Sequence, residues 1–217
     1  MLTVHHLKVS QSERIIWLLE ELDLPYELHV YQRDPSTQFA PVELRSVHPL
    51  GSAPVLCDGK IVLAESGAII EYILARYGNG RLVIPVTSPQ YPDYVYWFHY
   101  ANASLMTQIG VNWIAAMAAQ ASSNSPLLSS LHERLERHLQ WVEDRLSQAT
   151  YFAGSEFTAA DIMMHFPFGT MKVFYDVGLD NRPHIKAWLA RISDRVSYQR
   201  AIKAAGYDHD PARSHYA

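Results

Sequence analysis

The spacing of apolar positions changes period several times within the first 80 residues. Residues 2–6 alternate between apolar and polar character, which predicts a short strand. Residues 12–22 then place their apolar side chains on one helical face, and Pro25 ends that helix. Residues 26–31 alternate again and predict a second strand. This β-α-β unit predicts two parallel strands joined by a right-handed crossover.

The rest of this first region predicts a second helix, a hairpin and a third helix. Residues 37–46 favour a short, weak helix. Two short apolar runs, 54–57 and 60–63, flank Asp58-Gly59, which is a strong hairpin signal. Residues 66–77 then carry a helical apolar stripe. The order β-α-β-α-β-β-α predicts a small α/β sandwich.

The remainder of the chain has an almost wholly helical pattern. Glycines and prolines punctuate residues 78–92, and we interpret residues 81–90 as a linker. One long helix is expected over residues 94–121, with Gly110 as the candidate position for a kink, and further helices over 127–148, 158–176, 185–193 and 196–205. We therefore expect an α/β domain over residues 1–80 and an all-helical domain over residues 91–217.

Composition narrows the class of protein. The chain has 217 residues, and 48% of them are hydrophobic, so a sizeable core can form and global disorder is excluded. The net charge is −4, without a basic stripe interleaved with aromatics, so nucleic acid is not expected as a partner. The eleven histidines are dispersed without zinc-motif spacing, so no metal is expected.

The single cysteine and the short apolar segments indicate the cellular compartment of the protein. Cys57 is the single cysteine, which excludes a disulfide within the chain and favours a reducing compartment. Residues 1–6 lack the features of a secretory signal. The most apolar stretch, 111–121, is far shorter than the roughly 20 residues of a membrane helix. We expect a cytoplasmic protein without a membrane partner.

Two short motifs point to a binding site. Pro54 opens a predicted strand, where a cis bond would turn the chain and leave the backbone of Val55 free to pair with an extended peptide. Ser66 stands where a helix should begin, and a helix N-terminus suits a carboxylate, while Glu65 could receive an ammonium group. A structural turn and an ordinary cap would explain each motif alone. Together, one hairpin apart, they predict a site for a peptide with an α-amino acid head group.

The chain resembles the cytosolic glutathione transferases, of the serine type found in bacteria and fungi, over essentially its full length. The resemblance is carried by the Pro54 turn, by Glu65-Ser66 followed by Ala-Ile-Ile-x-Tyr-Ile, and by residues 154–161. It implies a thioredoxin-like N-terminal domain, an all-helical C-terminal domain, glutathione as co-substrate and a two-fold homodimer. Pro54 would then be the cis-proline of that fold, Val55 would hold the cysteinyl backbone, and Glu65 and Ser66 would hold the γ-glutamyl end. Ala53 would also belong to the glutathione-binding residues.

The loop before the first helix would activate the thiol. Serine-type members place a serine four residues before an arginine, and Ser10 and Arg14 have this spacing. Ser12 and a backbone N–H compete for the role, and Ser10 could instead cap the helix in a box with Glu13. The absence of a cysteine in this loop argues against a thiol oxidoreductase.

The glycyl end of glutathione lacks the partner that relatives often have. Close relatives often carry lysine or glutamine just before the proline turn, whereas this chain has Ser52. The glycyl role would therefore belong to Ser52, or move to His48 or another residue.

The helical domain would line a pocket for a hydrophobic electrophile. Tyr100, Ala103 and Met106 recur at i, i+3 and i+6, and their side chains suit irregular apolar substrates. The expected function is conjugation of the glutathione thiolate, with glutathione-dependent peroxidase activity as a variant on the same site. A non-catalytic binding or regulatory protein on the same fold is the alternative. A capping box at 158–161 is expected to be structural.

Overall fold

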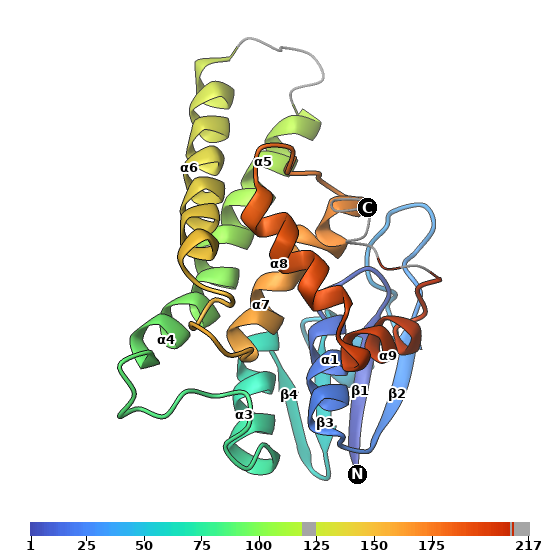
Figure 1. Ribbon diagram of the computed structural model, residues 1–217. Helices are drawn as coiled ribbons and strands as arrows, with labels where there is room; N and C mark the ends of the chain where they lie inside the picture. Colours follow the sequence, from blue (N-terminus) through green and yellow to red (C-terminus); the bar gives the residue numbers. More distant parts are fainter. Residues whose placement is uncertain (119–124, 209, 211–217) are drawn as a thin grey trace. The chain divides into compact units, whose positions relative to one another are not determined.

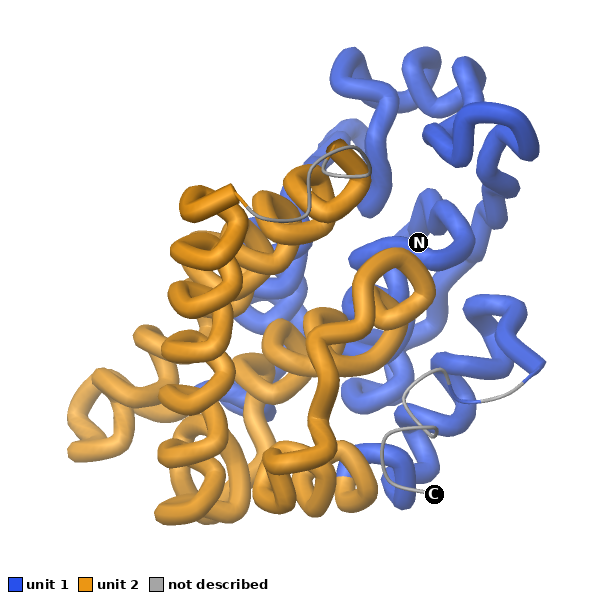
Figure 2. Tube along the Cα trace, turned by 90° about the horizontal axis from the view of Figure 1, so that it is seen from above, with its two compact units in different colours: residues 1–83, 192–211 blue, residues 84–191, 212–217 orange. Residues whose placement is uncertain are grey.

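The computed structural model describes residues 1–118, 125–208 and 210 of the chain (Figure 1). These residues form two compact units, which Figure 2 colours separately. The first comprises Met1–Val83 together with the described residues from Ile192 onward, and the second comprises Ile84–Arg191.

The first unit is built on a four-stranded sheet. Its strands are β1 (Leu2–Leu7), β2 (Tyr26–Tyr31), β3 (Val55–Asp58) and β4 (Ile61–Ala64). They lie in the order β2-β1-β3-β4, with β1 parallel to β2 and β3 antiparallel to both of its neighbours. The predicted β-α-β unit and hairpin are therefore confirmed, although the turn is Gly59-Lys60, one residue later than predicted, because Asp58 pairs with Ile61. Val55 lies in register with His5 on one side and Ala64 on the other.

Two helices, α1 (Glu13–Leu22) and α3 (Ser66–Tyr77), pack side by side against this sheet (Figure 1). Their leucine and isoleucine side chains are buried, and Ile15 and Ile69 are wholly so. The second helix, α2 (Leu44–Val47), is much shorter than the predicted 37–46. Pro41 explains the difference, because the residue before a proline is driven away from helical backbone angles.

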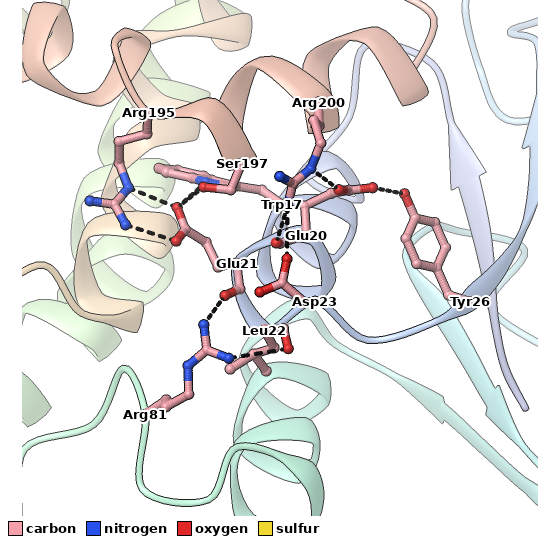
Figure 3. A network of polar contacts seen from close by, with 10 residues as sticks. All are labelled: Trp17, Glu20, Glu21, Leu22, Asp23, Tyr26, Arg81, Arg195, Ser197 and Arg200. Carbon is pink, nitrogen blue, oxygen red and sulfur yellow. Dashed lines mark hydrogen bonds and ion pairs between the residues drawn. The ribbon is translucent and has the colours of Figure 1, made fainter.

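The C-terminal helix α9 (Val196–Ala204) packs against α1 and so belongs to the first unit (Figure 3). Arg195 donates two hydrogen bonds of 2.7 Å to the Glu21 carboxylate, and the Ser197 hydroxyl donates a third to the same group. The expected boundary, with all of 91–217 in the helical domain, therefore differs from the observed units. A helical pattern shows that a helix forms but does not show against which domain it packs.

The second unit contains helices and a short π-helical turn. Its elements are α4 (Tyr91–Tyr100), a π-helix (Ala101–Met106), α5 (Thr107–Ala118), α6 (Pro126–Gln148), α7 (Ala159–Phe168), a 3₁₀ turn (Thr170–Val173) and α8 (Pro183–Ser193), whose last two residues fall in the first unit. The predicted helix over 94–121 is interrupted by the π-helical turn rather than at Gly110. Its last predicted residues, 119–121, lie outside the described residues.

The predicted capping box at the start of α7 is confirmed. The Thr158 hydroxyl accepts from the Ala160 N–H, and the Asp161 carboxylate accepts from the Thr158 N–H at 3.0 Å. The fully buried Asp161 also accepts from the Phe152 N–H and the Trp188 indole N–H, at 3.1 and 3.0 Å. Asp161 therefore joins the α6–α7 connection, the start of α7 and α8 in one buried group.

Candidate functional site

The loop between β1 and α1 holds Ser10 in a strained but well-supported position. Val9, just before it, has a φ of 56°, which is unfavourable for a β-branched residue. Two side chains hold its peptide groups: the Tyr207 hydroxyl accepts from the Val9 N–H at 3.0 Å, and Arg33 donates to the Val9 carbonyl at 2.6 Å. Ser10 follows with 7% of its surface exposed.

The alternative in which Ser10 caps the helix in a box with Glu13 is wrong. Helix α1 begins at Glu13, with Ser12 in the cap position, and the Ser12 side chain makes no capping bond. Instead, the Ser12 hydroxyl lies 2.7 Å from His6 Nδ1 and 2.6 Å from the Ser10 hydroxyl. The Ser10 Oγ accepts from the Ser12 N–H at 3.2 Å. Contacts with the preceding strand and loop therefore replace the cap.

The two hydroxyls differ in their access to a ligand. Ser12 is fully buried and contacts Leu7 N, Leu7 O, His6 and Ser10, which fills its hydrogen-bonding capacity. Ser10 is slightly exposed and has two described partners, both belonging to Ser12. Of these two candidates, Ser10 is the one that retains hydrogen-bonding capacity.

The Pro54 turn and the Glu65-Ser66 step lie at adjacent ends of β3 and α3. The Ala53–Pro54 peptide bond is cis, as predicted. Glu65 has a φ of 69° and an exposed side chain, and Ser66 is buried as the first residue of α3 rather than its cap. The prediction of Ser66 as the N-cap is thus one residue out, because Glu65 turns the chain into the helix.

A buried arginine joins this step to the start of α1. Arg14 Nη1 donates to the Ser66 hydroxyl at 3.2 Å and to the Gln11 side-chain oxygen. Arg14 is 1% exposed, and burial lowers the pKa of its guanidinium to about 9, although nearby Glu13 opposes the shift. The N-termini of α1 and α3 thus meet around a buried cation, an arrangement that favours an anionic group.

The sequence indicated Arg14 only through its spacing from Ser10, and it indicated no role in the site for Gln11 or His6. The signal for Arg14 was weak, because it stands between Glu13 and the apolar run that begins with Ile15. A buried arginine in such a stretch is itself informative, since arginine is rarely buried without polar partners.

The residues before the proline turn lie in the loop that joins α2 to β3. Ser52 is exposed, Ala53 is partly buried, and His48 is partly buried at the end of α2. His48 Nδ1 accepts from the Leu50 N–H at 3.4 Å. The glycyl role of Ser52 or His48 stays a prediction.

The three candidates for the hydrophobic pocket lie at the junction of α4 and the π-helix. Tyr100 is buried, its hydroxyl lies 2.6 Å from His138 Nδ1 on α6, and its ring stacks on Tyr96. Ala103 is exposed and Met106 is partly buried. Because a π-helix has more residues per turn than an α-helix, positions three apart there do not keep the α-helical face that the spacing assumed.

Cys57 lies on β3 as a free, partly buried thiol 3.7 Å from His5 Nε2, and burial raises its pKa.

Within the described ranges, no group of three histidine, cysteine or acidic side chains could hold a metal ion. In the same part of the chain, no helix combines the length and apolar character required to cross a membrane.

Comparison with known families matches both units. The family described as "Glutathione S-transferase, N-terminal domain" matches residues 2–75, and "Glutathione S-transferase, C-terminal domain" matches residues 104–195. The chain belongs to the glutathione S-transferase family. The resemblance inferred from Pro54, Glu65 and Ser66 is thereby confirmed.

Individual transferases are similar over nearly the whole chain. Glutathione S-transferase 3 of Schizosaccharomyces pombe is 32% identical over 94% of this chain and 87% of its own length. A crystal structure of a glutathione S-transferase from Actinobacillus pleuropneumoniae is 34% identical, covers 100% of this chain and 97% of its own, and has a TM-score of 0.84. A sphingomonad glutathione S-transferase complexed with glutathione, 20% identical with a TM-score of 0.73 over 94% of this chain and 98% of its own, shares the fold.

In this transferase, the residues gathered in the first unit come from four segments of the chain. The β1–α1 loop supplies Ser10, the start of α1 supplies Arg14, the turn before β3 supplies Pro54, and the start of α3 supplies Ser66. The thioredoxin-like sheet brings these segments together at the ends of adjacent elements.

Proposed function

We propose that this transferase binds glutathione in the first unit and conjugates its thiolate to hydrophobic electrophiles. The observation that carries the proposal is the buried Arg14 guanidinium, which meets the Ser66 hydroxyl where the N-termini of α1 and α3 converge. A γ-glutamyl carboxylate suits this positive environment, and the exposed Glu65 beside it suits the ammonium group of the same residue. The sphingomonad relative, which shares this fold, is complexed with glutathione in its solved structure.

The rest of the tripeptide would extend along the proline turn. The backbone of Val55 would pair with the cysteinyl residue as an added strand, while Ser52 or His48 would contact the glycyl end. This direction brings the cysteinyl sulfur to the Ser10 loop. Ser10, rather than the saturated Ser12, would be the hydroxyl that meets the sulfur.

The chemical step needs the thiolate, because the thiol is a poor nucleophile and free cysteine has a pKa of about 8.5. Hydrogen-bond donors at the sulfur lower that pKa, and binding places the sulfur next to the electrophile. With an aryl halide, the sulfur forms a bond to the ring carbon and the halide leaves with its bonding electrons. We assign the electrophile pocket to Tyr100, Ala103 and Met106 of the second unit.

The remaining assignments follow family membership. We propose a homodimer, a cytoplasmic location in keeping with the free Cys57, and glutathione-dependent reduction of organic hydroperoxides as a second use of the same thiolate. Sedimentation at low micromolar concentration tests the dimer. Turnover of an organic hydroperoxide tests the second activity separately from conjugation.

Retention on immobilised glutathione, combined with turnover of a generic aryl halide, tests the main proposal. We expect both, and we expect Ser66→Ala to weaken retention more than it slows turnover at saturating glutathione. Retention without turnover of several electrophiles would instead indicate a binding or regulatory protein. Failure of the wild-type chain to be retained would contradict the proposed site itself.

A further inference from the structure

A chain of hydrogen bonds links the end of α9 to Ser10. His6 Nε2 lies 3.1 Å from the Ala205 carbonyl, His6 Nδ1 lies 2.7 Å from the Ser12 hydroxyl, and the Ser12 hydroxyl lies 2.6 Å from that of Ser10. All four residues belong to the first unit, and three of them are wholly buried. The function proposed above uses only Ser10 from this chain of contacts.

The direction of these hydrogen bonds follows from the chemistry of the groups. A carbonyl oxygen only accepts, so His6 Nε2 carries the proton that it donates to Ala205. Burial, opposed by this bond and assisted by nearby Lys8, lowers the pKa of His6 to about 4, so the ring is neutral at pH 7. Nδ1 is therefore unprotonated and requires a donor.

Ser12 supplies that donor. Its hydroxyl proton has three possible acceptors, Ser10 Oγ at 2.6 Å, His6 Nδ1 at 2.7 Å and the Leu7 carbonyl at 3.3 Å. Ser10 Oγ already accepts from the Ser12 N–H, whereas His6 Nδ1 would otherwise be buried without a described partner, which is costly. The Ser12 proton therefore points to His6, and the Ser12 oxygen accepts from the Leu7 N–H at 3.2 Å and from the Ser10 hydroxyl.

The contact between the Ser10 and Ser12 hydroxyls fixes the orientation of the Ser10 hydroxyl. Its only hydroxyl proton is donated to Ser12, and its oxygen accepts from the Ser12 N–H, which leaves one lone pair for a ligand. We propose that His6 is a positioning residue that, acting through Ser12, holds the Ser10 proton away from the glutathione sulfur. This inference rests on the proposed function, because it concerns the same sulfur.

As a consequence, the pKa of the bound thiol is higher than it would be if Ser10 were not hydrogen-bonded to Ser12. The free lone pair of Ser10 accepts from the neutral S–H, which favours the thiol. To stabilise the thiolate, Ser10 must turn its proton toward the sulfur and give up its hydrogen bond to Ser12. The loss of one such bond corresponds to a shift of roughly 0.5–1 pH unit in the thiol pKa.

We call the hydrogen bonds from His6 through Ser12 to Ser10 the relay. Removing the relay should therefore lower the pKa of the bound thiol, whereas removing Ser10 should raise it. We would titrate the ultraviolet absorbance of the thiolate of glutathione bound to the wild type, Ser10→Ala, Ser12→Ala and His6→Phe. We expect midpoints roughly 0.5–1 unit lower for Ser12→Ala and His6→Phe, and a higher midpoint for Ser10→Ala. The charged groups around the relay, Lys8, Glu13, Arg14 and Arg33, are the same in every variant.

Ser197→Ala is the matched control, because it removes a hydroxyl of the same unit that bonds Glu21 outside the relay. Its midpoint should equal that of the wild type. Midpoints for Ser12→Ala and His6→Phe that stay unchanged, or that rise together with Ser10→Ala, would overturn the proposal.

A second measurement needs neither folded variants nor glutathione. Nitrogen-15 NMR of the histidine-labelled wild-type chain reports the protonation of each ring nitrogen. We expect a neutral His6 with its proton on Nε2 at pH 7; a proton on Nδ1 would overturn the relay while leaving the proposed function intact. Conversely, a wild-type chain that does not bind glutathione would overturn the proposed function, and the tautomer of His6 would still be measured.

Discussion

Replacing Arg195 with methionine should destabilise the first unit, because it leaves a buried carboxylate without its cation. Glu21 is 7% exposed and accepts both Arg195 hydrogen bonds, together with bonds from Ser197 and the Trp17 indole (Figure 3). Loss of one partner from a buried pair costs about 3–5 kcal/mol. Because 28% of the Arg195 side chain is exposed, we expect the lower end, about 3 kcal/mol.

A double-mutant cycle with Glu21→Gln isolates the interaction. Glutamine keeps an acceptor for Trp17 and Ser197 but removes the charge, so Arg195→Met should cost much less in that background. We expect a coupling free energy of about 2 kcal/mol from urea unfolding, and a fall in melting temperature of about 6–12 °C for Arg195→Met alone. Single effects that add to within about 0.5 kcal/mol would refute the reasoning.

The pH dependence gives a second check on the same pair. Burial alone would raise the pKa of Glu21, but the hydrogen bonds from Arg195 and Ser197 outweigh it, so the folded pKa lies below the unfolded one. The stabilisation is therefore present above the unfolded pKa and is lost as the pH falls through the folded pKa. The cost of Arg195→Met should therefore shrink as the pH falls toward and through the lowered folded pKa of Glu21, where the carboxylate becomes protonated.

Arg200→Met is the matched control on the same helix. Arg200 pairs with Glu20 and Asp23, but 45% of its side chain is exposed. Exposed pairs contribute about 0–1 kcal/mol, so this variant should remain close to the wild type in urea. A loss equal to that of Arg195→Met would mean that the burial of Glu21 is not the cause.

Three further predictions concern the site and the second unit. Ser10→Ala should move the titration of bound thiolate to higher pH, and an unmoved curve would remove Ser10 from the site. Ser66→Ala should raise the Kd for glutathione roughly tenfold by calorimetry, whereas Ser46→Ala on the exposed surface of α2 should leave it unchanged. Asp161→Ala should lower the free energy of unfolding by about 3 kcal/mol, because three buried N–H donors lose their acceptor; a loss below about 1 kcal/mol would contradict this explanation.

Features with a local cause could be predicted from the sequence. The strands follow the alternation of their side chains, the hairpin follows Asp58-Gly59, and the box at Thr158 needs only residues three apart. Pro54 could be assigned a cis bond because a proline opened the strand. The Glu65-Ser66 step could be assigned to a helix start, although the cap was misplaced by one residue.

Features that depend on contacts between elements could not be predicted. Ser10-Gln11-Ser12-Glu13 satisfies the pattern of a capping box, yet His6, on the preceding strand, takes the Ser12 hydroxyl. Likewise, residues 196–205 have a clear helical pattern, but the pattern does not indicate that Arg195 would find Glu21, which lies 174 positions earlier. Hydrophobic periodicity identifies the buried face of a helix without identifying what covers it.

These distant contacts explain how a strained loop can present Ser10. A β-branched residue with positive φ is unfavourable and persists where the surroundings hold it. Val9 meets this condition through Arg33 and Tyr207, and His6 is bound by Ala205 just before Tyr207 in sequence. Both contacts from the C-terminal segment fall within three residues of the end of α9, which Arg195 anchors to α1. The segment that follows the helical domain in sequence is therefore part of the support for the proposed glutathione sulfur site.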